Sequence, residues 1–213
     1  MRDDFLNRYT TLPYLIDALH TQSIAMRSPE NWEDRNDRFY LERYKERKEL
    51  TVLLAVCFTA TRERFHHWKC FGDGASGVCI EFRKAKLLKG LAGRPEFRTR
   101  EVEYEKVATV EERMPDVDSW PFLKRLPFMD EREFRIIFES QAADLQEASI
   151  PFTSSCIRRI TLSPWLAKSA ADNVIRSLRS IGGCSNLKVS KSTLLENARW
   201  RKAIHRRRRI VSR

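Results

Sequence analysis

The sequence lacks any long apolar run and any closely spaced pair of cysteines. No stretch approaches the roughly 20 apolar residues that span a membrane, and no apolar signal core follows the charged segment Met1 to Asp4. The five cysteines are odd in number and widely spaced, without a C-x-x-C motif, which argues against a disulfide scaffold. We therefore predict a cytoplasmic protein with free thiols and no membrane partner.

Glycine is also scarce, and three of the seven glycines lie in the segment Gly72 to Gly77. This segment has no Gly-Lys-Ser/Thr, and an alternating strand pattern follows it, so it matches neither a P-loop nor a dinucleotide fingerprint. Metal-ligand spacing is equally weak, because a structural zinc site uses two close ligand pairs. The only loose cluster comprises His66, His67, Cys70 and Cys79, so we predict no metal site.

Positive charge, by contrast, is abundant. Lys and Arg total 40 against 29 Asp and Glu, which gives a net charge of +11 and a pI near 9.7. This balance favours polyanionic partners, namely RNA or DNA, a phosphate-rich ligand or an acidic protein. The tail 196–213 can grip phosphates and stack an aromatic ring on a base; the alternative is a solubilising tail or an arm for an acidic partner. The candidate nucleic-acid contacts are Trp200, Arg201, Arg206, Arg207, Arg208 and Arg209.

The apolar pattern predicts one α+β domain over residues 1–195. The chain of 213 residues is 42% hydrophobic and contains 12 Phe and 5 Trp, which suffices for a core. Strands and helices occur in mixed order, which favours a curved mixed or antiparallel sheet flanked by helices. The clearest expected strands are 5–9, 23–26, 51–59, 78–82, 133–139 and 157–162, with less distinct ones at 100–107 and 187–190; the expected helices begin at Leu12 and cover 38–48, 62–71 and 165–180.

Glu131 and Glu133 stand at the start of the apolar strand pattern 133–139. In an extended chain, residues two apart project from the same face, so we expect the two carboxylates side by side. Because paired carboxylates next to a core repel each other and lose solvation, the pair is a candidate catalytic site. The alternative is an edge strand whose glutamates face solvent and pair with Arg132 or Arg135.

Two further segments contain candidate binding residues. Arg8, with Tyr9 and Thr10, ends the first expected strand, where an arginine can clamp a pyrophosphate or a carboxylate. Trp68 and Phe71 precede the glycine-rich turn and can pack over a flat ligand such as nicotinamide or adenine. Their alternatives are an ordinary surface arginine and ordinary core aromatics.

Four stretches of the chain form a recognisable combination: Arg8-Tyr9-Thr10; Ser28-Pro29-Glu30-Asn31-Trp32-Glu33-Asp34; Cys57-Phe58-Thr59 with His67-Trp68 and Gly77-Val78-Cys79-Ile80-Glu81-Phe82; and Glu131-x-Glu133-Phe134-Arg135-Ile136. Together they resemble the bacterial domain-of-unknown-function family twenty-nine seventy-one, over about Phe5 to Leu195. Two departures are Arg35, where that family usually has Pro, and Phe71, where it usually has Tyr.

The layout of this family is similar to that of ADP-ribosyltransferases, and the resemblance implies an ADP-ribosyltransferase-like fold that uses NAD as substrate. It implies that Glu133 holds the ribose 2′-hydroxyl and that Glu131 orients or deprotonates the acceptor. It further implies that Arg8, with Tyr9 and Thr10, binds NAD, and that Trp68 and Phe71 form the nicotinamide pocket. Such a transferase would be a toxin or a phage-defence effector that modifies nucleic acid, with an antitoxin as a further partner.

Two other functions remain open on the residues alone. The net charge and the basic tail also suit a non-enzymatic binding module for nucleic acid or an acidic partner. A nuclease or other phosphate-handling enzyme could use Asp34, Asp37 and Glu133 with a divalent metal.

Overall fold

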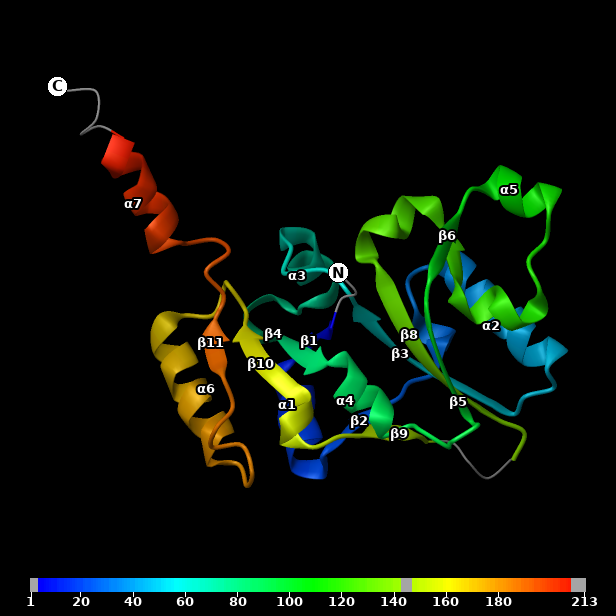
Figure 1. The fold of residues 1–213 in the computed structure, drawn as a ribbon, viewed down its shortest axis with the longest axis horizontal. Helices are drawn as coiled ribbons and strands as arrows, with labels where there is room; N and C mark the ends of the chain where they lie inside the picture. Colours follow the sequence, from blue (N-terminus) through cyan, green and yellow to red (C-terminus); the bar gives the residue numbers. More distant parts are fainter. Residues whose placement is uncertain (1–3, 143–146, 208–213) are drawn as a thin grey trace.

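A seven-stranded mixed sheet runs through the centre of the computed structural model, which describes residues 4–142 and 147–207 (Figure 1). The strand order is β11-β10-β4-β1-β3-β8-β5, and neighbours are antiparallel except β10 and β11, which are parallel. This confirms the prediction of a single domain with a mixed sheet flanked by helices. The strands are β1 (Phe5–Thr11), β3 (Val52–Thr59), β4 (Gly77–Arg83), β5 (Phe97–Glu101), β8 (Glu133–Ser140), β10 (Ile157–Leu162) and β11 (Val189–Lys191).

Helices and short segments cover both faces of this sheet. Its larger core, which includes Leu6, Val56, Ile80 and Ile136, is covered by α1 (Leu12–Thr21), α4 (Lys84–Lys89) and α6 (Lys168–Ser180). A smaller core on the opposite face packs α2 (Arg35–Arg47) against β3 and β8. Both faces of β3 and β8 are therefore buried, which explains why the two strands read as continuous apolar runs.

The remaining elements are short. They are β2 (Ser23–Ala25), β6 (Glu103–Glu105), β7 (Leu123–Arg125), β9 (Ser149–Pro151), α3 (Phe65–Phe71), α5 (Val107–Glu112), α7 (Ala198–Arg207), and the 3-10 helices η1 (Pro29–Asn31), η2 (Gly74–Ser76), η3 (Val117–Phe122), η4 (Leu126–Glu131) and η5 (Ser154–Cys156).

Two regions differ from the expected elements. The strand predicted over 100–107 is divided between β5, β6 and α5, and the region 111–129, expected to be a loop with a short helix, contains β7 between two 3-10 helices. The sequence did not indicate α4 or β9, since elements of six and three residues leave little periodicity.

The sheet opens between β1 and β3. β1 pairs with β4 along its whole length, from Phe5 to Thr11. With β3, however, it is in register only at Asn7 opposite Thr59, and the edge of β3 at Ala55 bridges to Arg27 instead. The two strands therefore meet at one end and diverge toward the other.

The C-terminal helix α7 projects away from the sheet and the other helices (Figure 1). Arg206 and Arg207 are the last two residues of α7, and only their backbone is described. Arg208 and Arg209 of the predicted basic tail lie outside the described residues. Over residues 4–142 and 147–207, no helix is both long enough and apolar enough to cross a membrane.

Candidate functional site

A row of polar residues crosses five neighbouring strands on one face of the sheet. Arg159 pairs with Glu81, Glu81 with Asn7, Asn7 with Thr59, and Thr59 with Glu133. Directly paired residues of antiparallel strands project to the same face, so these five residues form one line, which we call the polar row. Its last four members are buried, with exposed fractions of 3 to 6%. Because buried polar groups cost free energy unless they are partnered, the row is the strongest site candidate.

Glu133 ends this row within a buried network of charges. Its carboxylate accepts from Arg135 Nε at 2.7 Å and lies 3.4 Å from Lys124 Nζ, while its backbone N–H donates to the Tyr104 hydroxyl at 2.8 Å. Arg135 in turn holds both carboxylate oxygens of Asp37, at 2.9 and 2.7 Å. Burial by itself raises the pKa of Glu133, but Arg135 and Lys124 outweigh burial and lower it to about 2. Glu133 is therefore ionised at neutral pH.

Glu131 joins the same charge network through Lys124, a contact that the sequence did not indicate. The extended chain expected from Glu131 to Glu133 is wrong, because Glu131 ends η4 and Arg132 has a left-handed backbone with φ of 42°. The two carboxylates are instead drawn together by Lys124, whose Nζ lies 2.6 Å from Glu131 and 3.4 Å from Glu133. Burial raises the pKa of Glu131, against the opposing effect of Lys124. The edge-strand alternative is wrong about a solvent face, because β8 lies between β3 and β5 and Glu133 is buried. Its pairing of a glutamate with Arg135 is confirmed, by Glu133 at 2.7 Å.

The aromatic residues of α3 lie against β1. The Tyr9 ring makes edge contacts with Trp68 and His67, with ring centroids 5.1 and 5.6 Å apart. Trp68 is fully buried and donates its indole N–H to Glu63 at 2.8 Å. Phe71, by contrast, is 45% exposed and contacts only His67 of this cluster, with ring centroids 5.9 Å apart. Of the two predicted aromatics, only Trp68 thus contacts a predicted residue of β1.

Thr59 and Thr61 join β1, α3 and the end of η4 into one polar web. Asn7 donates its side-chain N–H to the Thr61 carbonyl at 2.7 Å, and the Thr61 hydroxyl lies 3.3 Å from His67 Nδ1. Thr59 donates its hydroxyl to the Glu131 carbonyl. The segments around the predicted residues are thus linked by Asn7, Thr61, His67 and Thr59, and not by the predicted side chains of Arg8, Trp68 and Glu133.

Arg8 points away from this web. In register it lies opposite Ile80, and strand alternation places it and Thr10 on the other face from Asn7 and Tyr9. Burial lowers the pKa of Arg8; the charge of Cys57 raises it and that of Arg27 lowers it further. Among the described residues Arg8 has no hydrogen bond or ion pair. The β1 residues on the side of Glu133 are accordingly Asn7 and Tyr9.

Several site residues were not found from the sequence. Asn7 and Tyr9 are two residues apart, as are Thr59 and Thr61. In a strand this spacing places both side chains on one face, so the sequence contained a signal that could have identified each pair. His67 was considered only as a metal ligand or as a neighbour of Trp68. Lys124 left no signal at all, since it lies in a proline-rich region that reads as a loop.

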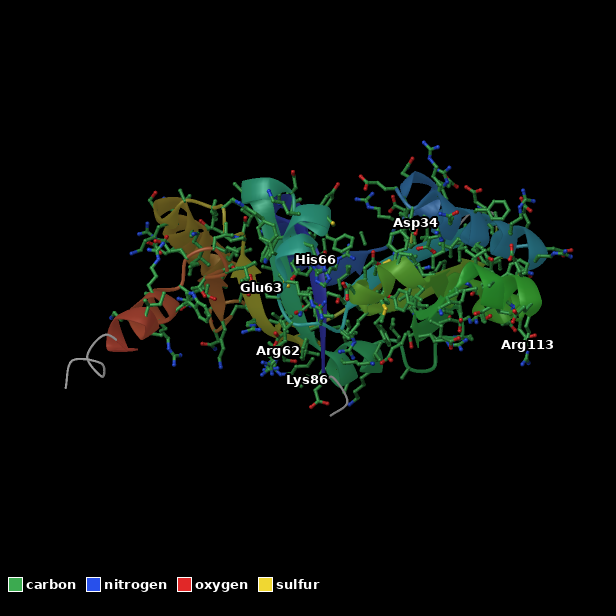
Figure 2. The ribbon with its side chains drawn as sticks, turned by 90° about the horizontal axis from the view of Figure 1, so that it is seen from above. Asp34, Arg62, Glu63, His66, Lys86 and Arg113 are labelled. Carbon is green, nitrogen blue, oxygen red and sulfur yellow. The ribbon has the colours of Figure 1, made fainter. Side chains whose placement is uncertain are left out.

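The carboxylates considered for a metal-dependent nuclease are engaged elsewhere. Both oxygens of Asp37 bind Arg135, and Asp34 caps α2 by accepting from the backbone N–H of Asn36 at 3.0 Å. In Figure 2, Asp34 lies beside α2, well apart from Glu63 and His66 at α3. Within the described parts of the chain, no group of three or more His, Cys, Asp or Glu side chains is arranged to hold a metal ion.

Two cavities border these residues. One, of about 580 Å³, lies along α3 and the turn that follows it, between Trp68 and Trp165. Another, of about 240 Å³, lies between α2 and α5 and is lined in part by Asp37 and Lys124. Trp68 and Phe71 thus border one hollow in the surface, and Asp37 and Lys124 border another.

Comparisons with protein-family models and with curated proteins find no match to this chain.

Proposed function

We propose that this chain is an NAD-dependent ADP-ribosyltransferase, as its resemblance to family twenty-nine seventy-one implies. The observation that carries the proposal is the pair Glu131 and Glu133, whose carboxylates lie 2.6 and 3.4 Å from Lys124 Nζ and whose pKa values are displaced in opposite directions. Two neighbouring carboxyl groups with divergent pKa values are typical of acid–base and electrostatic roles divided between two residues. The aromatic cluster of α3 joins the same polar web, which supports a site for a flat ring beside the carboxylates.

In this mechanism the bond between the ribose C1′ and the nicotinamide nitrogen of NAD breaks, and nicotinamide leaves with the bonding electrons. Glu133, which is ionised and held by Arg135, accepts a hydrogen bond from the ribose 2′-hydroxyl and stabilises the positive charge on C1′. Glu131, whose raised pKa suits proton transfer, takes the proton of the acceptor as the acceptor bonds to C1′. The products are nicotinamide and the ADP-ribosylated acceptor.

A phosphate-binding role for Arg8 fits its lack of a partner among the described residues. A guanidinium that has no ion pair among the described residues can bind the diphosphate of NAD, and strand alternation directs it to the face of β1 opposite Asn7. Phe71 is 45% exposed and packs against His67, so it can border the site, whereas Thr10 lies on the opposite face of β1 from Asn7.

The acceptor that we propose is nucleic acid, held by α7. Arg201 and Lys202 are exposed on this helix, with Arg201 Nη1 2.7 Å from Glu196. Trp200 is 75% exposed, which suits phosphate contacts combined with base stacking. A toxin or a phage-defence effector of this kind would require control by an antitoxin or an acidic partner protein.

The decisive experiment is NAD consumption by the purified protein, alone and with RNA, DNA or cell lysate. We expect turnover in the wild type, loss of at least 100-fold in Glu133→Gln, and a smaller loss in Glu131→Gln. Glu101→Gln is the matched control, because Glu101 lies on the neighbouring strand β5 with a side chain that is 72% exposed. Thermal unfolding of each variant separates loss of chemistry from loss of folding, and full turnover by a folded Glu133→Gln protein would disprove the mechanism.

The second candidate function is a non-enzymatic module that binds nucleic acid, favoured by the projection of α7 from the domain (Figure 1). It predicts that affinity for RNA or DNA falls steeply with added salt, because bound phosphates release counterions. Nucleic-acid binding together with complete absence of NAD binding and turnover would favour this function over the enzyme.

A further inference from the structure

Aromatic rings surround the ammonium group of Lys69 on an exposed face of α3. Phe65 and Lys69 are four residues apart and therefore share one face of this helix. Lys69 Nζ lies 4.5 Å from the centroid of the Trp165 ring and 5.8 Å from that of Phe65, and the two rings are 5.9 Å apart. In the described parts of the chain, Lys69 forms no ion pair with a carboxylate. The ammonium is thus held by rings and is available to an anion.

The cavity of about 580 Å³ along α3 borders the same side chains. Its lining includes Lys69, Trp165 and Phe71, whose side chain is 45% exposed. The turn after α3 also lines it and lies close against the helix, since a Cβ at Gly72 would meet the Trp68 ring and the Trp68 carbonyl oxygen at 3.0 Å each. The volume lies within the range of about 300–1,000 Å³ that is typical of small-ligand sites. The cavity therefore has room for one planar ring among aromatic side chains.

The charges around this cavity favour a ligand with negative charge. The charged side chains of its lining are Lys69 and Asp73, and the Asp73 carboxylate accepts a hydrogen bond from Ser76 Oγ at 3.2 Å. A further cation, Lys168, is exposed at the start of α6, shortly after Trp165. The whole chain has a net charge of +11. A ligand that joins planar rings to phosphates, such as a nucleic acid, is therefore the best match.

The basic helix α7 begins close to this cavity. Glu63 lies beside α3 (Figure 2) and accepts hydrogen bonds from Trp68 Nε1, at 2.8 Å, and from the Ser192 hydroxyl. Ser192 directly follows β11, and α7 begins shortly afterwards, at Ala198. The segment that leads to α7 is thus attached next to α3, and a strand bound to α7 lies within reach of the cavity.

We propose that the cavity between α3 and Trp165 binds one unpaired base of single-stranded nucleic acid, with Lys69 on the adjoining phosphate. The base stacks on the Trp165 ring in place of the ammonium, which moves to the phosphate. This exchange is favourable because an exposed cation–π contact is weaker than a base stacked on an aromatic ring. A duplex does not supply such a base, since its bases are paired and stacked on one another. The inference rests on the proposed function for its nucleic-acid acceptor, which it narrows to a single strand.

The test is fluorescence anisotropy of labelled oligo(dT), and of its duplex with oligo(dA), titrated with the whole chain at several salt concentrations. We expect oligo(dT) to bind more tightly than the duplex. Trp165→Ala should weaken oligo(dT) at least tenfold, because the stack is lost, and should leave the duplex unchanged. Lys69→Gln should make the dependence of log Kd on log salt less steep by about 0.7, the value for one phosphate contact on a single strand.

Phe39→Ala and Arg43→Gln are the matched controls. Phe39 is an exposed aromatic residue of α2, and the Arg43 guanidinium lies 5.2 Å from its ring centroid, so this pair repeats the cation and ring away from the cavity. Neither control should change the affinity for oligo(dT). Thermal unfolding shows whether each variant folds, and Lys69→Gln, at an exposed position, decides the inference if Trp165→Ala does not fold.

Three results would each overturn the inference: no binding of oligo(dT), wild-type affinity in a folded Trp165→Ala protein, or an unchanged salt dependence in Lys69→Gln. Failure of the proposed function is a different result, because this binding is measured without NAD: oligo(dT) would bind with the expected Trp165 dependence, but NAD would not be consumed. Conversely, Glu133-dependent NAD turnover without binding of oligo(dT) would keep the function and remove this site.

Discussion

The two faces of the same strands differ sharply in chemistry. On one face, Leu6, Val56 and Ile80 are packed into the larger apolar core. On the other, their sequence neighbours Asn7 and Glu81 belong to the polar row, and both are as deeply buried as the apolar residues. One face is thus stabilised by apolar area removed from water, whereas the other depends on each buried charge or dipole finding a partner.

The polar face should be the less tolerant of the two, because removal of one charge leaves another buried and unpaired. Arg135 is completely buried and pairs with both Glu133 and Asp37. We expect Arg135→Met to lower the free energy of unfolding by about 3–5 kcal/mol, measured by urea denaturation. A loss below about 1 kcal/mol would show that the network contributes little and that the two faces are equivalent.

Acid should weaken the polar face selectively. The pKa of Glu133 is lowered to about 2 in the folded protein, from an ordinary value of 4.5. A carboxyl with a depressed folded pKa stabilises the protein above its unfolded pKa, and this stability is lost as pH falls through the folded pKa. The free energy of unfolding should therefore decline by about 3 kcal/mol from this one group between pH 4.5 and pH 2.

The variant Glu133→Gln isolates this contribution. Its free energy of unfolding should vary less with pH across the same interval, although other carboxyl groups continue to titrate in both proteins. Parallel pH profiles for the wild type and Glu133→Gln would contradict an ionised, ion-paired Glu133.

A conservative change on the apolar face provides the comparison for these losses. Ile136 is fully buried in the larger core, next in sequence to Arg135. Ile136→Val removes one methylene, and we expect the free energy of unfolding to fall by about 0.5–1.5 kcal/mol without any change in its pH dependence. A loss as large as that of Arg135→Met would remove the distinction between the faces.

The smallest effect on stability is expected for α7. Its described side chains, including Trp200 and Ile204, are exposed, so removal of residues 198–213 should leave the melting temperature of the domain unchanged. The same truncation should reduce affinity for RNA or DNA at least tenfold if the helix holds phosphates. Unchanged affinity would assign nucleic-acid binding to another surface or to none.

Periodicity predicted the main elements because they bury regular patterns. The apolar run 51–59 is β3 and the alternating run 78–82 is β4, and the helix expected from Leu12 is α1. The prediction of Glu131 and Glu133 as an extended pair failed in detail, because the backbone at Arg132 turns through a left-handed conformation. Regular spacing in the sequence cannot predict such a turn, because contacts from elsewhere in the chain stabilise it. One of these is the hydrogen bond from the Ala60 backbone N–H to the Arg132 carbonyl at 3.0 Å.

The sequence by itself therefore determined the fold class, the basic character of the C-terminal segment and the segments from which the candidate site is built. Only the tertiary structure decided which face of β1 meets Glu133, so that Asn7 and Tyr9 lie in the web and Arg8 does not. It also decided that Lys124, Arg135 and Asp37 set the charge of the site. The physical reason is that strand alternation is local, whereas register between strands and the partners of a buried charge depend on residues far apart in the chain.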